Sequence, residues 1–222
     1  LLALLGSGMS FAQSSIEEVN IESHWVAGQV YVLYGAGGNI GALTGEDGIV
    51  IIDDQFEPLA TKIETSLFAL SAAGKNKVTY VVNTHFHGDH TGSNGYFSKS
   101  ASILAHENVR ERLKRKQITQ GLPVITYEQG IKMHLNSEMV HVKHLAAGHT
   151  DGDSVVFFQQ ANVWHLGDLF FEARFPFIDL DSGGTLNGYV ANIKRLLAQI
   201  DDNAKIIPGH GRLTDKSGLQ RS

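Results

Sequence analysis

From residue 84 the chain reads Thr84-His85-Phe86-His87-Gly88-Asp89-His90, directly after a crowded apolar run over residues 78–82. The run lacks a clear polar alternation, which is typical of a β-strand buried on both faces. Three imidazoles and one carboxylate then follow within six residues, where Gly88 is expected to allow the turn. An isolated histidine is usually a core or surface residue, but four ligating side chains at this spacing predict a metal site. Zinc suits such a donor set, and iron or manganese is not excluded.

Three further segments have the same form, with a ligating residue type beside glycine after an apolar, strand-like run. They are Gly148-His149-Thr150, Gly167-Asp168 and Pro208-Gly209-His210-Gly211. Glycine lets the backbone turn sharply, so loops at strand ends can bring their side chains into one cleft. Each segment is weak evidence alone, but together with the first cluster they predict a shared site.

The remaining pattern alternates short strand-like runs with a few amphipathic helices. Strands are expected near residues 30–34, 49–53, 138–145, 154–159, 161–165 and 206–207. Helices are expected from Pro58 to about residue 70, over residues 107–116 and over residues 186–200. No linker interrupts this order. We therefore predict one α/β domain over residues 16–222, with two packed β-sheets that are each covered by helices.

Composition excludes several classes of protein. The 222 residues are 42% hydrophobic and 18% charged, which suits a globular core, and the formal net charge is −5. No basic run exceeds three residues and no apolar run reaches the ~18 residues of a membrane span, so we expect neither nucleic acid nor a membrane as partner. Cysteine is absent, which excludes disulfides, thiolate nucleophiles and iron–sulfur clusters. A small-molecule substrate is the remaining expectation, and nothing indicates the oligomeric state.

The first residues suggest a targeting segment. Leu1-Leu2-Ala3-Leu4-Leu5 is followed by Ser10-Phe11-Ala12, an apolar stretch before a small-x-Ala site. This pattern predicts that residues 1–12 are the remnant of a secretory signal peptide and that the protein is exported, to a bacterial periplasm. The alternative is an ordinary amphipathic first strand or helix.

With these motifs, residues 20–211 resemble the metallo-β-lactamase superfamily, whose H-x-H-x-D-H motif stands here at residues 85–90. The resemblance implies an αββα sandwich, with two mixed sheets flanked by helices and the metal ions at one edge between the sheets. It also implies a ligand set for two zinc ions. His85, His87 and His149 would hold the first ion, Asp89, His90 and His210 the second, and Asp168 would bridge both.

This division is chemically reasonable. Neutral imidazoles leave the first ion strongly electrophilic, so that a bound water ionises near pH 7 and the resulting hydroxide is the nucleophile. Asp89 would orient that hydroxide and act as the catalytic carboxylate. Together, Asp89 and Asp168 would reduce the repulsion between two adjacent dications.

The sequence departs from each branch of the superfamily in some way. Residues 148–156 and 204–211 resemble the broad-spectrum β-lactamases, and residues 35–40 lie where that branch has a mobile hairpin loop over the substrate. That branch, however, has a cysteine in place of Asp168, a residue other than His at position 90 and a lysine in place of Phe171. The first two departures match glyoxalase II and lactonases instead.

We therefore expect a dinuclear zinc hydrolase with weak or promiscuous opening of the β-lactam ring. The alternative is a lactone, ester or thioester hydrolase on the same centre. A non-catalytic binding protein and a mononuclear iron dioxygenase fit less well, because all seven ligand types are present.

The substrate pocket is less well defined. Candidates are Phe171, Arg174, which would replace the lysine's charge, and Asn39 in the glycine-rich segment. An aromatic cluster of Phe170, Phe171, Phe175 and Phe177 either lines this pocket or packs in the core. Asp53 either orients a ligating imidazole or caps its strand. The other histidines are expected to have ordinary core or surface roles: His24, His106, His134, His141, His144 and His165.

Overall fold

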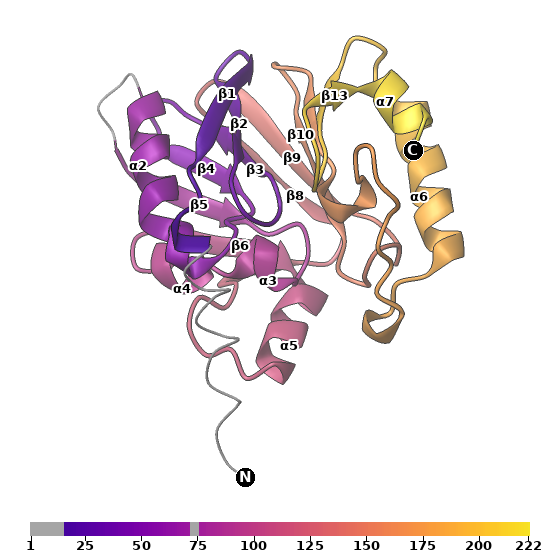
Figure 1. Ribbon diagram of the computed structural model, residues 1–222, viewed down its shortest axis with the longest axis horizontal. Coiled ribbons are helices and arrows are strands. Elements are labelled where there is room, and N and C mark those ends of the chain that lie inside the picture. Colours follow the sequence, from indigo (N-terminus) through magenta and orange to yellow (C-terminus); the bar gives the residue numbers. More distant parts are fainter. Residues whose placement is uncertain (1–15, 72–75) are drawn as a thin grey trace.

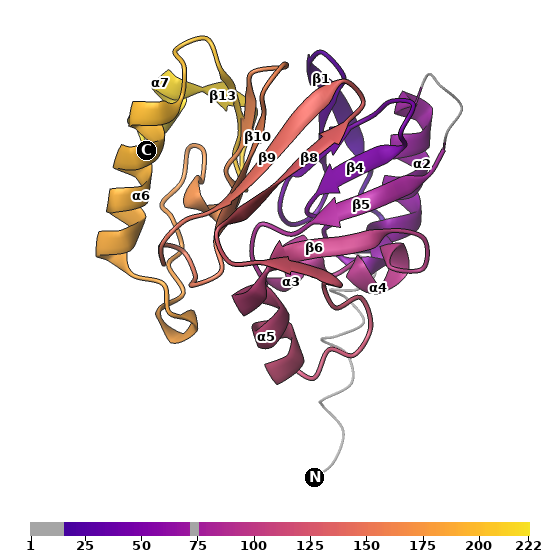
Figure 2. The same ribbon diagram turned by 180° about the vertical axis from the view of Figure 1, so that it is seen from behind.

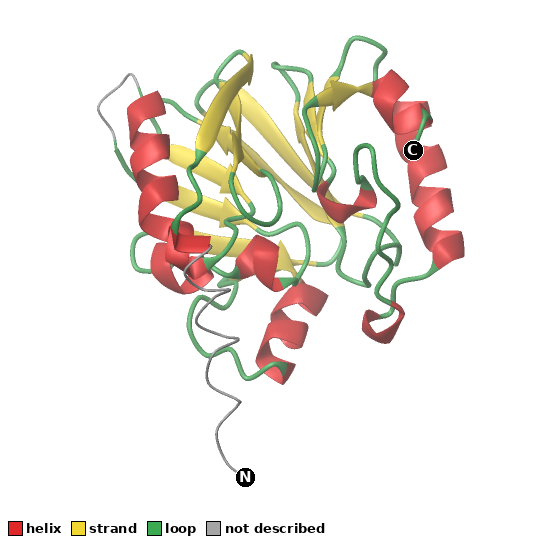
Figure 3. Cartoon of the chain, in the orientation of Figure 1, coloured by secondary structure: helices red, strands yellow, loops and turns green. Residues whose placement is uncertain are grey.

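The computed structural model describes residues 16–71 and 76–222, so the predicted signal-peptide residues 1–12 lie outside the described part. Two β-sheets pack face to face, and helices cover their outer faces (Figure 1). The same layering is seen in Figure 3, where the strands occupy the centre and the longer helices the two flanks. The predicted arrangement of two mixed sheets in an αββα sandwich is confirmed.

The first sheet has seven strands in chain order. They are β1 (Glu22–Ala27), β2 (Val30–Tyr34), β3 (Ile40–Leu43), β4 (Ile49–Ile52), β5 (Val78–Val82), β6 (Ser102–His106) and β7 (Ile125–Tyr127). Neighbours from β1 to β4 pair antiparallel, and those from β4 to β7 pair parallel. Figure 2 shows β4, β5 and β6 as adjacent strands.

The second sheet has six strands in the order β13-β12-β11-β10-β9-β8. They are β8 (Gly130–Leu135), β9 (Glu138–His144), β10 (Ser154–Phe158), β11 (Val163–His165), β12 (Lys205–Ile207) and β13 (Thr214–Asp215). Only β11 and β12 pair parallel. The sequence patterns had predicted β9 to β12 to within two residues at each end.

Helices connect and cover the sheets. The α-helices are α2 (Ala60–Leu70), α3 (Gly88–Thr91), α4 (Asn94–Phe97), α5 (Glu107–Arg115), α6 (Leu186–Gln199) and α7 (Lys216–Gln220). The 3₁₀ turns are η1 (Glu57–Leu59), η2 (Gly167–Leu169) and η3 (Leu180–Ser182). Pro58 stands in the first turn of η1, which continues directly into α2. Within the described ranges, no helix combines the length and apolar character that crossing a bilayer requires.

Strand β4 shows why the central strands lack polar alternation. Val50 and Ile52 point into the core between the two sheets. Ile49 and Ile51 point the other way, into a second core that includes Ile63 of α2. Because both faces of the sheet are covered, alternate positions are equally apolar. The second sheet packs in the same manner against α6.

Phe158 is a sensitive point of the core between the sheets. Its side chain is fully buried there, at the end of β10. We expect Phe158→Ala to lower the free energy of unfolding by about 3–5 kcal/mol, through lost burial and the cavity left behind. Denaturant unfolding measures this. Phe175→Ala is the matched control, since that ring is 97% exposed, and it should change stability by less than about 0.5 kcal/mol.

The fold gathers the predicted ligands at one rim of the sandwich. Strands β9, β11 and β12 run in the same direction, since β9 and β11 both pair antiparallel with β10 and β11 pairs parallel with β12. Their carboxyl ends therefore share an edge, and the loops that follow carry His149, Asp168 and His210. The loop after β5 in the first sheet carries the histidine-rich stretch to the same place.

Candidate metal centre

The histidine-rich stretch makes a turn between β5 and the short helix α3. His87 lies just before α3 with extended backbone, φ −65° and ψ 148°, and the helix then places Asp89 and His90 on its first turn. Gly88, which was expected to allow this turn, does not use the special freedom of glycine there. Gly88 has no positive φ, and a Cβ atom there would meet no heavy atom within 4 Å.

Four of the predicted ligands form a first set: His85, His87, His149 and Asp168. The Nδ1 atom of His87 lies 3.1 Å from Nε2 of His85 and 3.0 Å from Nε2 of His149. Oδ2 of Asp168 lies 3.4 Å from the same Nε2 of His149 and 3.7 Å from that of His85. Three ring nitrogens and one carboxylate oxygen therefore converge on one point.

Hydrogen bonds determine which nitrogen of each ring carries the proton. His149 Nδ1 lies 2.7 Å from the carbonyl oxygen of Phe177, which can only accept. His87 Nε2 lies 2.9 Å from Oδ2 of Asp179, so it is also the donor. His85 Nδ1 donates to Oγ1 of Thr84, 3.0 Å away.

The Thr84 hydroxyl cannot be the donor to His85, because it donates to Oδ2 of Asp53 at 2.8 Å. The nitrogens of His85, His87 and His149 that face one another therefore all present lone pairs. Nitrogen atoms 3.0–3.1 Å apart whose lone pairs face one another repel unless a cation lies between them. This arrangement fits a metal ion with nitrogen ligands.

The other three predicted ligands form a second set: Asp89, His90 and His210. Asp89 Oδ2 lies 3.3 Å from Nε2 of His210 and 3.6 Å from Nε2 of His90. Oδ1 of Asp168 lies 3.1 Å from Nε2 of His90 and 3.5 Å from Nε2 of His210. One oxygen of Asp168 thus faces each set, as expected of a carboxylate shared by two ions.

Two buried atoms that face each other 3.1 Å apart, one from the second set and one from the shared carboxylate, have no other hydrogen-bond partner among the described residues. They are His90 Nε2 and Asp168 Oδ1. The opposite nitrogen of His90, Nδ1, lies 2.7 Å from Oδ2 of Asp53, so Asp53 orients this imidazole, one of the two roles expected for it. Buried polar atoms without a partner are costly, and a cation between them would satisfy both.

The ionisation of the two sets differs in the absence of ions. Burial lowers the pKa of His85 well below its ordinary value and also lowers that of His149, so both rings are neutral and ready to ligate. Burial acts in the same direction on His90 and His210, but there the neighbouring carboxylates prevail. They raise the pKa of His90 well above its ordinary value and that of His210 to about 9. Binding an ion at the second set would therefore release protons.

The loop that carries His149 is held by Asp153, a residue that the sequence reasoning missed. Its carboxylate accepts hydrogen bonds from the backbone N–H groups of His149 (2.7 Å) and Thr150 (2.9 Å), and from the Thr150 hydroxyl. Burial raises the pKa of Asp153 to about 7 in spite of these donors. Asp179 was missed as well, because it caps the N-terminus of η3, far along the chain from His87.

His165 was expected to be an ordinary core histidine, but it is buried beside the centre. Its Nε2 lies 3.1 Å from the carbonyl oxygen of Asn39. The other histidines outside the centre keep ordinary positions. His106 and His144 stack on each other with ring centroids 3.7 Å apart, and His24 lies on the surface near Glu22.

The glycine-rich segment between β2 and β3 contacts residues of the second set. It lies where the β-lactamase branch has a mobile hairpin loop. Gly38 N–H donates to the carbonyl of Asp89 at 3.1 Å, and the Gly38 carbonyl accepts from Nε2 of Gln55 at 2.7 Å. A Cβ atom at Gly38 would collide with the ring of His90. The segment therefore packs directly on second-set residues.

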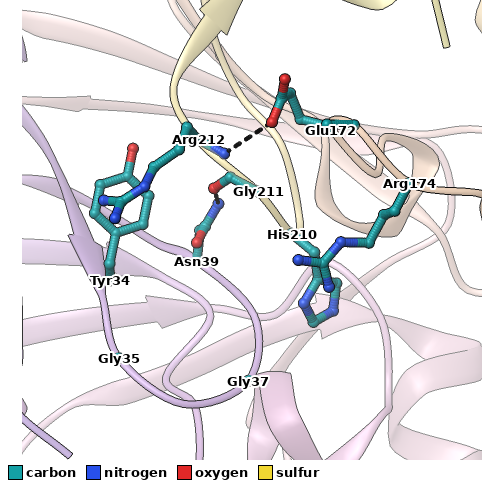
Figure 4. A pocket seen from close by; sticks show the side chains of 10 residues that line it. Tyr34, Gly35, Gly37, Asn39, Glu172, Arg174, His210, Gly211 and Arg212 are labelled. Atoms are coloured by element: carbon teal, nitrogen blue, oxygen red, sulfur yellow. Dashed lines mark hydrogen bonds between the residues drawn. The ribbon is translucent and has the colours of Figure 1, made fainter.

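A cavity of about 520 Å³ opens beside His210 (Figure 4). It is lined by Tyr34, Gly35, Gly37, Asn39, Glu172, Ala173, Arg174, His210, Gly211 and Arg212. Two of the three predicted pocket residues, Arg174 and Asn39, line it. Asn39, however, directs its amide nitrogen at the carbonyls of Pro208 and Gly211, 2.9 Å from each, rather than at the cavity.

The predicted aromatic cluster does not form a single wall. Phe170 is buried in the core under α6, whereas Phe175 and Phe177 are exposed. Phe171 is buried beside the ligands, and its ring stacks on His210 with a centroid distance of 5.2 Å and an interplanar angle of 9°. The ring of Phe177 lies 5.9 Å from that of His149. Phe171 and Phe177 thus flank the centre.

Comparison with known proteins agrees with this geometry. The sequence profile of the Metallo-beta-lactamase superfamily matches residues 33–210, so the chain belongs to that superfamily of hydrolases. A hydroxyacylglutathione hydrolase of Nitrosococcus oceani is 27% identical, over 68% of this chain and 56% of its own length. A metallo-beta-lactamase type 2 of Bacillus cereus is 23% identical, over 80% of this chain and 68% of its own.

Another relative has a different activity in its name. The alpha subunit of a 2,4-dinitroanisole O-demethylase from a Nocardioides strain is 24% identical, over 76% of this chain and 51% of its own length. The chain spans only about half the length of several of these relatives. Among solved structures, a metallo-beta-lactamase from Pontibacter korlensis superposes with a TM-score of 0.77 at 19% identity, covering 90% of this chain and 96% of that one. That likeness shows the fold.

Proposed function

We propose that this protein is a hydrolase that holds two divalent ions, preferentially zinc, and opens cyclic amides, with weak or promiscuous activity on the β-lactam ring. The observation that carries the proposal is the convergence of three unprotonated ring nitrogens at 3.0–3.1 Å, next to a carboxylate that faces both sets. When bound, the ions would polarise the scissile carbonyl and supply a nucleophile from water near neutral pH.

The chain's own residues have distinct tasks in this proposal. His85, His87 and His149 hold the first ion, and Asp89, His90 and His210 the second, while Asp168 is shared. Asp89 orients the attacking water, because it is the most accessible to solvent of the three carboxylates that lie within the rim. The exposed fraction of its side chain is 26%, against 5% for Asp168 and none for Asp53. Asp53 and Asp179 fix the orientation of His90 and His87 by accepting their remaining N–H groups.

The alternative is a lactone, ester or thioester hydrolase on the same centre. Asp168 and His90 favour it, because the β-lactamase branch has other residues there, and the hydroxyacylglutathione hydrolase relative points the same way. An apolar groove of about 770 Å³, lined in part by Phe171, Phe175, Leu186 and Val190, lies beside the metal rim and also favours apolar substrates.

A substrate comparison tests the proposal. The zinc-loaded protein is assayed with a chromogenic cephalosporin and with a panel of acyl-homoserine lactones, aryl esters and thioesters. We expect cephalosporin turnover that stops on chelation and returns with zinc. No cephalosporin turnover by protein that contains two metal equivalents would refute the β-lactamase part. A specificity constant higher by orders of magnitude on one panel member would establish the alternative.

Arg174 is the residue that we expect to bind a substrate carboxylate. It lines the cavity beside His210, whereas the uncharged Phe171 takes the position of the family lysine. Arg174→Ala should raise KM for a carboxylate-bearing substrate about three- to tenfold, less than a buried pair would because the side chain is exposed to solvent. Michaelis–Menten kinetics on the acid and on its neutral methyl ester measure this. An equal effect on both substrates would argue against charge recognition.

A further inference from the structure

The amide of Asn39 connects the glycine-rich segment of the first sheet to the loop that carries His210. Its Nδ2 lies 2.9 Å from the carbonyl oxygens of both Pro208 and Gly211, which flank His210 in the chain. Carbonyl oxygens can only accept, so the side chain must present its nitrogen to them. In addition, the backbone N–H of Asn39 donates to the Gly209 carbonyl at 2.7 Å. Three hydrogen bonds from Asn39 therefore hold this loop, and Figure 4 shows the one to Gly211.

His165 fixes Asn39 from the other side. The Nε2 atom of this fully buried imidazole donates to the Asn39 carbonyl at 3.1 Å, and its Nδ1 accepts the backbone N–H of Gly167 at 3.3 Å. Burial lowers the pKa of His165, so the ring is neutral and can donate from one nitrogen while it accepts at the other. Gly167 immediately precedes Asp168. A continuous chain of hydrogen bonds thus runs from the Asp168 turn through His165 and Asn39 to the His210 loop.

This chain of contacts serves the second set in particular. His210 belongs only to that set, and in the described part of the chain its loop is otherwise held by a single bridge with Phe171 and by backbone hydrogen bonds to the turn over residues 167–172. The loop must nevertheless stay close to Asp168, since a Cβ atom at Gly209 would collide with Oδ1 of that carboxylate. The three histidines of the first set, by contrast, are oriented by Thr84, Asp179 and the Phe177 carbonyl. None of these groups contacts Asn39.

We propose that Asn39, fixed by His165, is a positioning residue that sets the affinity of the second ion by holding His210 in place. The inference rests on the two-ion centre proposed above. Removing the Asn39 amide should leave the first ion bound as before and weaken the second about 10- to 100-fold, as is typical for groups that orient metal ligands.

Cobalt titration distinguishes the two ions. Metal-free wild type and Asn39→Ala are titrated with Co²⁺, while the visible d–d absorption and calorimetry report each equivalent separately. In Asn39→Ala we expect the first dissociation constant to change less than about twofold and the second to rise at least tenfold. His165→Phe, which removes the donor to the Asn39 carbonyl, should also weaken the second ion at least tenfold and serves if Asn39→Ala does not fold.

Asn136→Ala is the matched control. Asn136 is also a buried asparagine whose amide donates to a carbonyl, that of Gly48 at 2.9 Å, but it lies in the turn between β8 and β9, at the opposite end of β9 from the metal rim. Its backbone has φ 56°, so alanine is strained there, and the control should be destabilised while both ions bind normally.

Each outcome has a defined meaning. Selective weakening of the second ion in Asn39→Ala, with a normal control, supports the inference. An unchanged second ion, an equal loss of both ions, or the same loss in Asn136→Ala overturns it. Two ions bound normally by both wild type and Asn39→Ala would leave the proposed function standing and remove only the positioning role. Failure of wild type to bind a second ion would refute the two-ion centre itself, and the inference with it.

Discussion

Chelation is expected to abolish hydrolysis and to lower the melting temperature by about 8–16 °C. The ion-free centre keeps three facing lone pairs and two unpartnered buried atoms, which the bound ions would satisfy. Binding to the folded state alone stabilises it by about 4 kcal/mol when free ligand is a thousandfold above Kd. For a chain of this size, each kcal/mol corresponds to roughly 2–4 °C. Differential scanning calorimetry with and without chelator measures the shift.

The same experiment has a pH control. Imidazoles bind ions only when neutral, and the neighbouring carboxylates raise the pKa of His90 well above its ordinary value and that of His210 to about 9, so the stabilisation by zinc at the second set should shrink as the pH falls below about 9. Re-addition of zinc at neutral pH should restore both activity and melting temperature. If the chelated protein, shown by elemental analysis to be free of metal, melts at an unchanged temperature or still hydrolyses substrate, the metal centre is refuted.

Asp89→Asn is expected to lower kcat/KM about 10²- to 10⁴-fold, the usual contribution of a group that orients water and accepts its proton. An amide has no negative charge to perform either task, and it is also a poorer ligand for the second ion. The fold should remain intact, since Asp89 is partly exposed at the rim and lies outside the three hydrophobic cores that hold the layers together.

Asp181→Asn is the control for that variant. Asp181 lies in η3, near the centre but exposed, so it should retain full activity. Steady-state kinetics are combined with metal analysis of Asp89→Asn. Loss of the second ion would lower the metal content, whereas loss of water orientation alone would leave it unchanged. Activity of Asp89→Asn within about threefold of wild type would show that another group orients the water.

The sequence sufficed to predict the members of the centre because each lies at the end of an apolar run. Once β5, β9, β11 and β12 were recognised, the edge shared by their ends brought all seven side chains together. Strands such as β8 were harder to recognise. Its polar residues Lys132 and His134 lie at an edge of the sheet, and Met133 is the one buried residue of the strand.

The residues that orient the ligands could not be predicted from spacing. Asp179 contacts His87 across 92 positions, and the Phe177 carbonyl is a backbone group that any residue could supply. Asn39 was expected to face substrate because of its place in the glycine-rich segment. The structure instead uses its amide to hold the His210 loop, a contact across 169 positions that no local pattern indicates.

The origin of the seven side chains has a consequence for how the protein acquires activity. His85, His87, Asp89 and His90 come from the loop after β5, whereas His149, Asp168 and His210 follow strands of the other sheet. Neither half of the polypeptide carries the complete set by itself. The complete ligand set therefore exists only where the two sheets are packed together, and ions bound there would link the two halves of the chain much as a cross-link does.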